Sequence, residues 1–182
     1  MTCIVGLIHD GKTYIGGDAA GCSPHTGDIT VRVEPKVFFK GPYIFGYTTS
    51  FRMGQLLEWV IPGPEEKKGL GDLRGHLITT WIPVLRQWLK HEGYMHIHEG
   101  VEHAGTFLVG YKGQLCGVYG DMQVAVSTDG YLSVGSGESV ALGVLYATKK
   151  SKMKPIDRVT LALKAAAHHN MCVREPFTVI QS

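Results

Sequence analysis

The sequence predicts an α+β fold in which two antiparallel sheets pack face to face and helices cover the outside of each sheet. Three observations lead to this class. Apolar residues alternate with a period of two in several short runs, and they recur at helical spacing in others. These runs follow the order strands, two helices, strands, two helices, strand. Because strand and helix runs are segregated, a layered domain is favoured, and this arrangement would bury every apolar face.

The first part of the chain is expected to form strands around tight turns. A hairpin over residues 2–8 and 12–17 is predicted by β-branched runs on either side of Asp10-Gly11. Residues 19–28 are rich in Gly, Ser, Pro and Ala, which predicts a loop. Further strands are expected at residues 29–33, 36–39 and 43–47, the last two around a Gly41-Pro42 turn.

Two helices are expected next. Ser50 is a suitable N-cap for a helix over residues 51–61, whose apolar residues recur at helical spacing. Residues 62–71 are polar and contain helix breakers, so they indicate an exposed loop. Asp72 can cap a second helix that continues to residue 89, in which Pro83 is expected to introduce a kink.

The second part of the chain returns to a period of two and then to helices. Strands are expected at residues 106–109, 115–119, 123–127 and 131–134, separated by glycine-containing turns. Helices are expected over residues 138–148 and from Pro155 onward, and a last strand over residues 177–180.

Length and composition fit one globular domain over residues 1–182. Hydrophobic residues make up 44% of the chain and charged residues 19%, which suffices for a core and excludes disorder. The net charge of +2 gives no electrostatic reason to expect nucleic acid. The longest uncharged apolar stretch, at residues 78–85, is far shorter than the ~18 residues of a membrane span, so no membrane partner is expected. The N-terminus lacks a secretory signal pattern, which favours a cytoplasmic protein.

The four cysteines are far apart in the sequence and form no Cys-x-x-Cys motif. This spacing disfavours a disulfide framework and a zinc ribbon. We therefore expect free thiols, as is usual in a reducing cytosol. The residues concerned are Cys3, Cys22, Cys116 and Cys172.

Four residues have chemistry that fits together. If Met1 is removed, Thr2 carries a hydroxyl nucleophile and an α-amine that can serve as its base, with an ordinary amine pKa of about 7.7–8.0. A nearby Lys36 ammonium would lower the pKa of that amine by like-charge repulsion, and Asp18 would hold Lys36. Backbone N–H groups of the Gly135-Ser136-Gly137 loop, at a helix start, could stabilise a developing oxyanion. Each residue alone has an ordinary structural role, so the hypothesis depends on their combination.

The motifs that contain these residues resemble a known family. The segments are TCIVGLIHDGKTYIGGDAAG, then Lys36-Val37, then GSGESVALGVLYA, and ALKAAAHHN before a closing strand. Together they are similar to the proteasome β-subunit family, and most similar to its short bacterial HslV type. The resemblance runs in order through nearly the whole chain and is weakest over residues 62–103. It implies an N-terminal-nucleophile (Ntn) hydrolase with a four-layer αββα sandwich.

The resemblance also implies roles and partners. Thr2 matches the nucleophile, Asp18 the acid after the second strand, Lys36 the catalytic lysine, and Ser136 the serine of the Gly-Ser-Gly loop. The family implies peptide or protein substrates, homo-oligomeric rings, and, for HslV-type members, an ATP-dependent unfoldase. No cofactor and no metal are implied.

Some positions depart from the family pattern. Thr49 stands where the family commonly has a glycine whose amide serves the oxyanion. Asn170 and Val173 stand where many members have an acid and a serine that support the terminal amine. Asn170 keeps hydrogen-bonding capacity and is expected to support the amine, whereas Val173 loses it. The oxyanion and substrate cleft is expected to involve Thr49, Gly135, Gly137 and Ala20, with further contributions from residues 20–22, Pro35 and Thr48.

The leading hypothesis is thus a threonine peptidase or amidohydrolase, and two alternatives stay open. The departures at Thr49, Asn170 and Val173, or a retained Met1, would fit a catalytically inactive scaffold that assembles into a ring. A small-molecule amidohydrolase would use the same residues on a different substrate.

Histidines raise a separate possibility, a metal site. His96 and His98 would share one face of a strand, and His91 and His103 are close in sequence. No carboxylate or thiol stands at a recognised ligand spacing near them, so surface histidines without a metal are expected.

Overall fold

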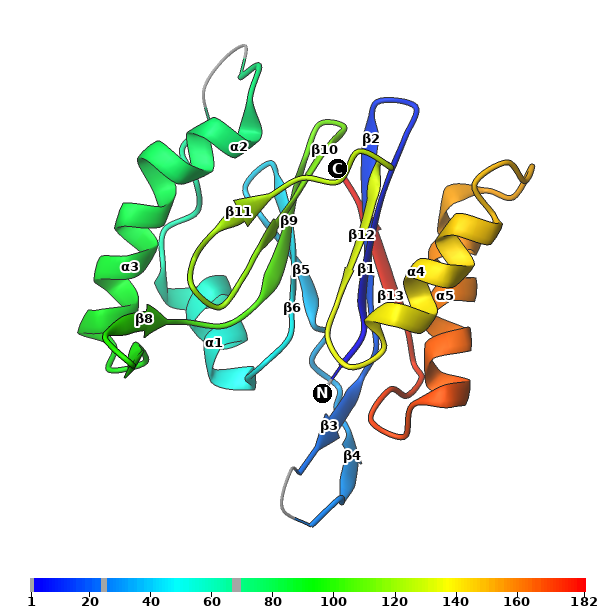
Figure 1. The fold of residues 1–182 in the computed structure, drawn as a ribbon, viewed down its shortest axis with the longest axis horizontal. Helices are drawn as coiled ribbons and strands as arrows, with labels where there is room; N and C mark the ends of the chain where they lie inside the picture. The colour runs from blue at the N-terminus through cyan, green and yellow to red at the C-terminus, as the bar shows by residue number, and fades with distance from the viewer. Residues whose placement is uncertain (1, 24–25, 67–69) are drawn as a thin grey trace.

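The computed structural model describes residues 2–23, 26–66 and 70–182 and contains two main antiparallel sheets (Figure 1). The first sheet has the order β12-β1-β2-β13 and the second has the order β11-β10-β9-β6-β5. The bounds in the first sheet are β1 (Ile4–His9), β2 (Lys12–Gly17), β12 (Tyr131–Val134) and β13 (Thr178–Gln181). Those in the second are β5 (Val37–Lys40), β6 (Tyr43–Tyr47), β9 (Phe107–Tyr111), β10 (Gln114–Val118) and β11 (Val124–Ala125).

Strand β1 is paired on both sides, which fixes where the chain begins in the sheet. Ile4 lies opposite Gly17 of β2 and opposite Val134 of β12. The residues just before β1, just after β2 and just after β12 therefore lie together, at one end of these three neighbouring strands. Thr2, Asp18 and the loop at Gly135 occupy these three positions.

Helices cover the outer face of each sheet (Figure 1). Helices α4 (Glu138–Ala147) and α5 (Pro155–His169) pack on the first sheet, where their apolar residues join those of β1 in one buried cluster. The second sheet is covered by α1 (Phe51–Gln55), η1 (Leu56–Val60), α2 (Leu73–His76), η2 (Leu77–Trp81) and α3 (Ile82–His91). Within the described residues, no helix combines the length and apolarity needed to cross a bilayer.

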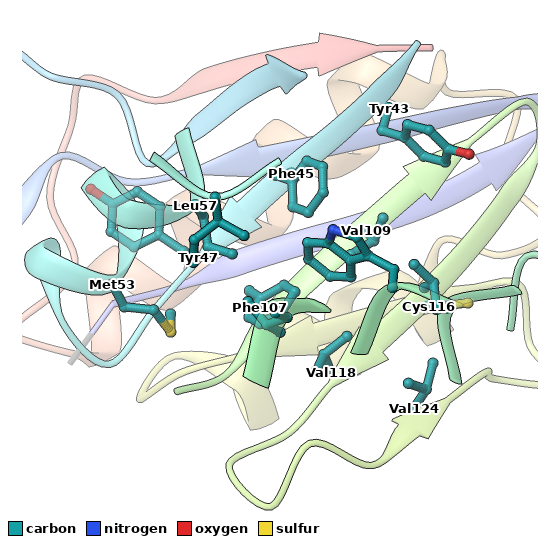
Figure 2. Packing of buried hydrophobic residues seen from close by; sticks show 14 of the residues in the cluster. Tyr43, Phe45, Tyr47, Met53, Leu57, Phe107, Val109, Cys116, Val118 and Val124 are labelled. Carbon is teal, nitrogen blue, oxygen red and sulfur yellow. The ribbon is translucent and has the colours of Figure 1, made fainter. Parts of the chain in front are cut away.

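Aromatic side chains pack with aliphatic ones in the core between the second sheet and its helices (Figure 2). The Trp81 ring meets the Phe107 ring edge to face at 6.0 Å, and the Tyr43 and Tyr111 rings stack at 4.6 Å. Burial of each large apolar side chain stabilises the fold by roughly 1.5–3 kcal/mol.

A separate cluster fills the space between the two sheets. It joins aliphatic residues of both, and a glycine sets how closely they approach. A Cβ at Gly46 would lie only 2.6 Å from a methyl of Ile4 and 2.7 Å from one of Ile15. The cluster comprises Ile4, Ile15, Val37, Ile44, Leu108, Leu115 and Val134.

The predicted α+β class and most predicted elements agree with the structure, with three differences. The expected loop at residues 19–28 contains a short strand, β3 (Ala20–Cys22), paired with β4 (Ile29–Val31). A second hairpin, β7 (His96–His98) with β8 (Val101–His103), lies where no strand pair was expected, because its strands have no buried face. The helix expected over 72–89 continues past Pro83, which stands near the start of α3 directly after the π-helical η2.

Two further expectations concern the start of that helix and the loop before it. Asp72 occupies the N-cap position of α2, but its side chain makes no capping hydrogen bond. The expected loop at 62–71 is described only in part, because residues 67–69 lie outside the described residues. Met1 and its expected removal also lie outside them.

Candidate active site

Four residues from distant parts of the sequence meet at the sheet edge where β1 begins. Thr2 precedes β1, Asp18 follows β2, Lys36 precedes β5, and Ser136 lies between β12 and α4. Each of the four residues lies one or two positions beyond the end of a paired strand, and these strand ends lie close together. The four residues that the motifs indicate thus form one cluster.

Lys36 is the centre of this cluster. Its ammonium nitrogen lies 2.5 Å from Thr2 Oγ1, 2.9 Å from Asp18 Oδ1 and 2.6 Å from the Ala20 carbonyl oxygen. The side chain is only 2% exposed. An ammonium has three protons to donate, and three oxygens surround it, so its hydrogen-bonding capacity is filled.

Asp18 is held by the backbone around it. Its Oδ1 accepts a hydrogen bond from the Cys3 amide at 3.0 Å, and its Oδ2 accepts from the amides of Ala20 at 2.9 Å and Arg174 at 3.4 Å. These contacts fix the carboxylate against the buried Lys36. Breaking such a buried pair leaves an uncompensated charge and costs several kcal/mol, about 3–5.

Burial and the neighbouring carboxylate shift the pKa of Lys36 in opposite directions. Burial lowers the pKa of the Lys36 ammonium, and the Asp18 carboxylate opposes that effect. Burial also raises the pKa of the neighbouring Cys3 thiol to about 12, so this thiol stays protonated at neutral pH. Of the two adjacent side chains, the Thr2 hydroxyl is therefore the candidate nucleophile, and Cys3 is a packing residue.

The Gly-Ser-Gly loop contacts the backbone of Thr2. The Thr2 nitrogen lies 3.1 Å from Ser136 Oγ, and the Thr2 carbonyl oxygen accepts a hydrogen bond from the Gly137 amide at 3.2 Å. Gly135 has a φ of +103°, and a Cβ there would lie 2.4 Å from the same carbonyl oxygen. Both its conformation and its surroundings require glycine at this position.

Asn170 supports this loop rather than Thr2 itself. Its side-chain amide donates to the Ser136 carbonyl oxygen at 2.8 Å, and its Oδ1 accepts from the Cys172 amide at 2.9 Å. Val173 is completely buried and packs in the cluster under α4 and α5. The expected support of the Thr2 nitrogen by Asn170 is thus indirect, through Ser136.

A pocket of about 260 Å³ opens beside Thr2 and Lys36. Thr2 reaches it although only 4% of the residue is exposed. Of the expected cleft residues, Cys22, Thr48 and Thr49 line it, whereas Ala20, Gly21, Pro35, Gly135 and Gly137 do not. The complete lining is Thr2, Cys22, Lys36, Tyr47, Thr48, Thr49, Ser50 and Phe51.

Sequence reasoning missed the aromatic and serine lining of this pocket. The sequence patterns predict Tyr47 only as the end of a strand, Phe51 only as the start of a helix and Ser50 only as a helix cap. Ser50 does cap α1, because its Oγ accepts from the Met53 amide at 3.1 Å. Only the closeness of these residues to Thr48 in the sequence could have indicated their second role.

Thr49 adopts an unusual conformation at the pocket. Its φ of +72° is rare for a β-branched residue and costs roughly 1–2 kcal/mol. Its hydroxyl accepts a hydrogen bond from the Thr106 amide at 3.1 Å, and the Thr48 amide donates to the Thr106 carbonyl at 3.0 Å. Within the described residues, the Thr49 amide itself donates no hydrogen bond. It is thus an unpartnered donor in a residue that lines the pocket.

The expectation of four free thiols is wrong for one pair. Cys22 and Cys172 form a disulfide, with a Cα–Cα distance of 5.5 Å and 150 residues between them in the sequence. The packing of β3 against the segment after α5 brings them together, which sequence spacing could not reveal. Cys3 and Cys116 are free, as expected, and both are buried.

The histidines do not gather at this site. The His98 and His103 rings lie on the two strands of the β7–β8 hairpin, tilted, with centroids 6.3 Å apart. In the described part of the chain, no three His, Cys, Asp or Glu side chains are grouped as a metal ion would require.

Comparisons with known proteins bear on the fold. No protein-family model matches the chain, and no curated protein matches its sequence. Solved structures are nevertheless similar over almost its entire length. The BPH of Thiobacillus denitrificans, solved in complex with epoxomicin, is 18% identical with a TM-score of 0.80, over 99% of this chain and 97% of that chain.

Two other solved structures share the architecture. Eukaryotic HslV from Trypanosoma brucei is 13% identical with a TM-score of 0.69, over 98% of both chains. An Anbu (Gly-1) mutant from Hyphomicrobium sp. strain MC1 is 13% identical with a TM-score of 0.70, over 98% of this chain and 80% of that chain. The chain therefore has the proteasome-type Ntn-hydrolase fold that its sequence motifs indicate.

Proposed function

We propose that this protein is a threonine-type N-terminal-nucleophile hydrolase that cleaves peptide or other amide bonds through Thr2 after removal of Met1. The observation that carries the proposal is the contact of 2.5 Å between Lys36 Nζ and Thr2 Oγ1 at the wall of an open pocket. In this proposal residues 1–182 form one domain, and the two sheets with their outer helices form the four-layer αββα sandwich.

Thr2 would supply both nucleophile and base. Its Oγ attacks the substrate carbonyl carbon while its α-amine takes the hydroxyl proton, and that proton then passes to the leaving amine. An ester between Thr2 and the acyl group remains, and water hydrolyses it in the same way. The nitrogen that becomes the α-amine already lies 3.1 Å from Ser136 Oγ, which supports a role for Ser136 in orienting it.

Lys36 would act on Thr2 without transferring a proton itself. Its positive charge disfavours protonation of the nearby α-amine, so the amine stays available as a base near neutral pH. Its hydrogen bond to Oγ1 also stabilises negative charge that develops there. Asp18 keeps Lys36 charged and in place, which is the role of a positioning residue.

Two groups are suited to stabilise the oxyanion of the tetrahedral intermediate. The Thr49 amide has no partner among the described residues and belongs to a residue that lines the pocket. The helix N-terminus at Gly135–Gly137 contributes a favourable dipole. We assign the oxyanion role to the Thr49 amide, because Gly137 already donates to the Thr2 carbonyl.

Further expectations come from the sequence and from its resemblance to the family. These are homo-oligomeric rings, an ATP-dependent unfoldase as partner, a cytoplasmic location, and no cofactor. One similar protein was solved in complex with epoxomicin. We propose that epoxomicin also binds this chain in the pocket beside Thr2.

The experiment combines the mass of the purified native protein with its activity. We expect a chain lighter by one methionine residue, hydrolysis of peptide amides, and a stable mass increase with epoxomicin. Thr2→Ala should abolish hydrolysis and leave assembly unchanged, while Thr2→Ser, which keeps a hydroxyl, should retain activity. Full activity of Thr2→Ala would refute the mechanism.

The inactive scaffold is the second candidate. It is favoured by the Thr49 side chain at the pocket and by Val173, which offers no polar group to the amine. Retention of Met1 together with assembly into a ring and no hydrolysis would establish this candidate. A small-molecule amidohydrolase remains a variant of the first proposal, and small amides tested beside peptides separate the two.

A further inference from the structure

The Cys22–Cys172 disulfide joins two regions that both contact the candidate site. At one end, Cys22 lines the pocket that contains Thr2 and Lys36. It also lines a neighbouring pocket, which shares Phe51 with the first. A change in the position of Cys22 would therefore alter the wall against which a substrate lies.

At the other end, a short chain of hydrogen bonds leads from Cys172 to Thr2. The Cys172 amide donates to Asn170 Oδ1 at 2.9 Å, and the Asn170 side-chain amide donates to the Ser136 carbonyl at 2.8 Å. Ser136 Oγ lies 3.1 Å from the Thr2 nitrogen. The position of Cys172 thus bears on the Gly-Ser-Gly loop.

The same segment also reaches the Asp18 side of the site. The Arg174 amide donates to Asp18 Oδ2 at 3.4 Å, and the Arg174 carbonyl accepts from the Ala19 amide at 2.9 Å. Between Cys172 and Arg174, Val173 is completely buried. One covalent bond therefore ties the pocket wall to the segment that supports both Ser136 and Asp18.

We propose that the Cys22–Cys172 disulfide is a thiol-sensitive positioning element of the Thr2 site, active when oxidised and weakened when reduced. The inference rests on the proposed hydrolase function for its effect on catalysis. Its structural part, the coupling of the disulfide to the Ser136 loop through Asn170, can be tested without any catalytic activity. In the reducing compartment that we expect for this chain, disulfides are mostly transient and redox-sensing.

The reductant is a dithiol, and the exchange is a two-electron reaction. A thiolate of the dithiol attacks the Cys22 sulfur, which lines the pocket, whereas Cys172 is only 6% exposed. The Cys22–Cys172 bond breaks, and Cys172 leaves as a thiolate and takes up a proton. The second thiol of the reagent then attacks the mixed disulfide, which releases Cys22 as a thiol and leaves the reagent as a cyclic disulfide.

The first test counts thiols and does not depend on activity. Protein purified without reductant is denatured and alkylated before and after treatment with dithiothreitol, and its mass is measured. We expect two of the four cysteines of the chain to react before reduction and all four afterwards. Four reactive thiols before reduction would overturn the proposal while leaving the hydrolase function open.

The second test measures peptide hydrolysis in the oxidised, reduced and reoxidised protein, well below the melting temperature. Because small misplacements of reacting groups lower rates strongly, we expect reduction to lower kcat/KM by about ten- to a hundredfold, with recovery on reoxidation. The pH profile of kcat should shift as well, since support of the Thr2 amine is weakened. Equal kcat/KM in both redox states would overturn the proposal.

Variants separate the disulfide from other thiol effects. Cys22→Ser, Cys172→Ser and the double variant should all have the reduced activity, be insensitive to dithiothreitol, and differ little from one another. Cys116→Ala is the matched control, since Cys116 is buried in the core away from the site and should leave the redox response intact. A redox response that persists in the double variant would contradict the assignment.

A third measurement covers the case in which the chain is an inactive scaffold or a cysteine variant does not fold. Hydrogen exchange of the wild-type protein is compared in its oxidised and reduced states. We expect faster exchange after reduction in peptides that contain Gly135–Gly137 and Asn170–Arg174, and unchanged exchange in β9 and β10. Unchanged exchange around Ser136 would overturn the coupling.

Discussion

The Lys36 ammonium lies 2.5 Å from the Thr2 hydroxyl oxygen, although the two residues are 34 positions apart in the sequence. No loop flexibility is needed to form this contact, because Thr2 lies two residues before the central strand β1 and Lys36 lies one residue before β5. The contact joins the first sheet to the second, near the start of β1 and the start of β5. The proposed catalysis depends on this contact, and the buried Lys36 ammonium in turn depends on its Asp18 counter-ion.

Replacement of Lys36 by methionine should lower kcat by about 10²–10⁴-fold, because the amine would then be protonated near neutral pH. Burial lowers the pKa of Lys36 from its ordinary 10.5. Since the mechanism needs the ammonium, wild-type activity is present below this lowered pKa and falls as the pH rises through it. A pH–rate profile should thus show an alkaline loss that begins below 10.5.

Lys40 provides the matched control for Lys36. Burial also lowers the pKa of Lys40, but its ammonium donates to the carbonyls of Leu57 and Glu58 at 2.6 and 2.8 Å, away from Thr2. Lys40→Met should therefore keep the wild-type pH profile. If Lys36→Met turned over substrate at the wild-type rate, the assigned role of Lys36 would be wrong.

Asp18→Asn should destabilise the fold by about 3–5 kcal/mol, because it leaves the buried Lys36 ammonium without a counter-ion. The loss of Asp18 removes the influence that opposes burial, so the pKa of Lys36 falls further. The folded state then binds fewer protons than the unfolded state, and stability rises with pH. Urea unfolding at pH 6 to 9 should show this rise, which is steeper than in the wild type.

The control for Asp18→Asn is Asp129→Asn, which breaks the exposed ion pair of Asp129 with Lys149. Exposed pairs contribute little, so its unfolding midpoint should match that of the wild type. Equal, small effects of both substitutions would show that Asp18 and Lys36 are not the buried pair described above.

Gly135→Ala should reduce both stability and activity, whereas Gly130→Ala should reduce stability alone. Both glycines have a positive φ, so alanine costs roughly 1–2 kcal/mol at either position. Only the Gly135 Cβ would collide with the Thr2 carbonyl oxygen, since nothing lies within 4 Å of a Cβ at Gly130. Thermal unfolding and peptide hydrolysis measured on both variants check this, and intact turnover in Gly135→Ala would contradict it.

Thr49→Gly should keep kcat within about threefold of the wild type, because the oxyanion donor is the backbone amide and not the side chain. Removal of the side chain also widens the pocket, so substrates with larger side chains should gain in kcat/KM. A panel of peptide amides that differ in one side chain measures both effects. A large loss of kcat would instead assign a role to the Thr49 hydroxyl.

Much of the site could be predicted because its residues stand at the ends of strands with clear patterns. Asp10-Gly11 identifies the first hairpin, and that hairpin places Thr2 and Asp18 beside the ends of neighbouring strands. Ser136 follows the last strand of a regular series. The chemistry of each residue type then limits what such neighbours can do together.

The other features of the site depend on contacts between residues that are far apart in the sequence, and no local pattern encodes such contacts. Cys22 and Cys172 are 150 residues apart, and only the packing of β3 against the segment after α5 makes them partners. Phe51 was read correctly as the start of a helix, but one side of a helix start can also face a pocket. Asn170 was expected to reach the Thr2 nitrogen, yet its side chain stops at the Ser136 carbonyl.

Strand β1 pairs with a strand on each side, which holds Ile4 in place. The number of residues between Thr2 and Ile4 therefore determines where the Thr2 hydroxyl lies. Side chains alternate between the two faces of a strand, so a shift of one position would send the hydroxyl to the opposite side. The sheet itself would tolerate one residue more or one fewer before Ile4, because its ladder begins only there. Variants with one residue inserted or deleted between Thr2 and Ile4 should consequently fold normally but show no hydrolysis, even after removal of Met1.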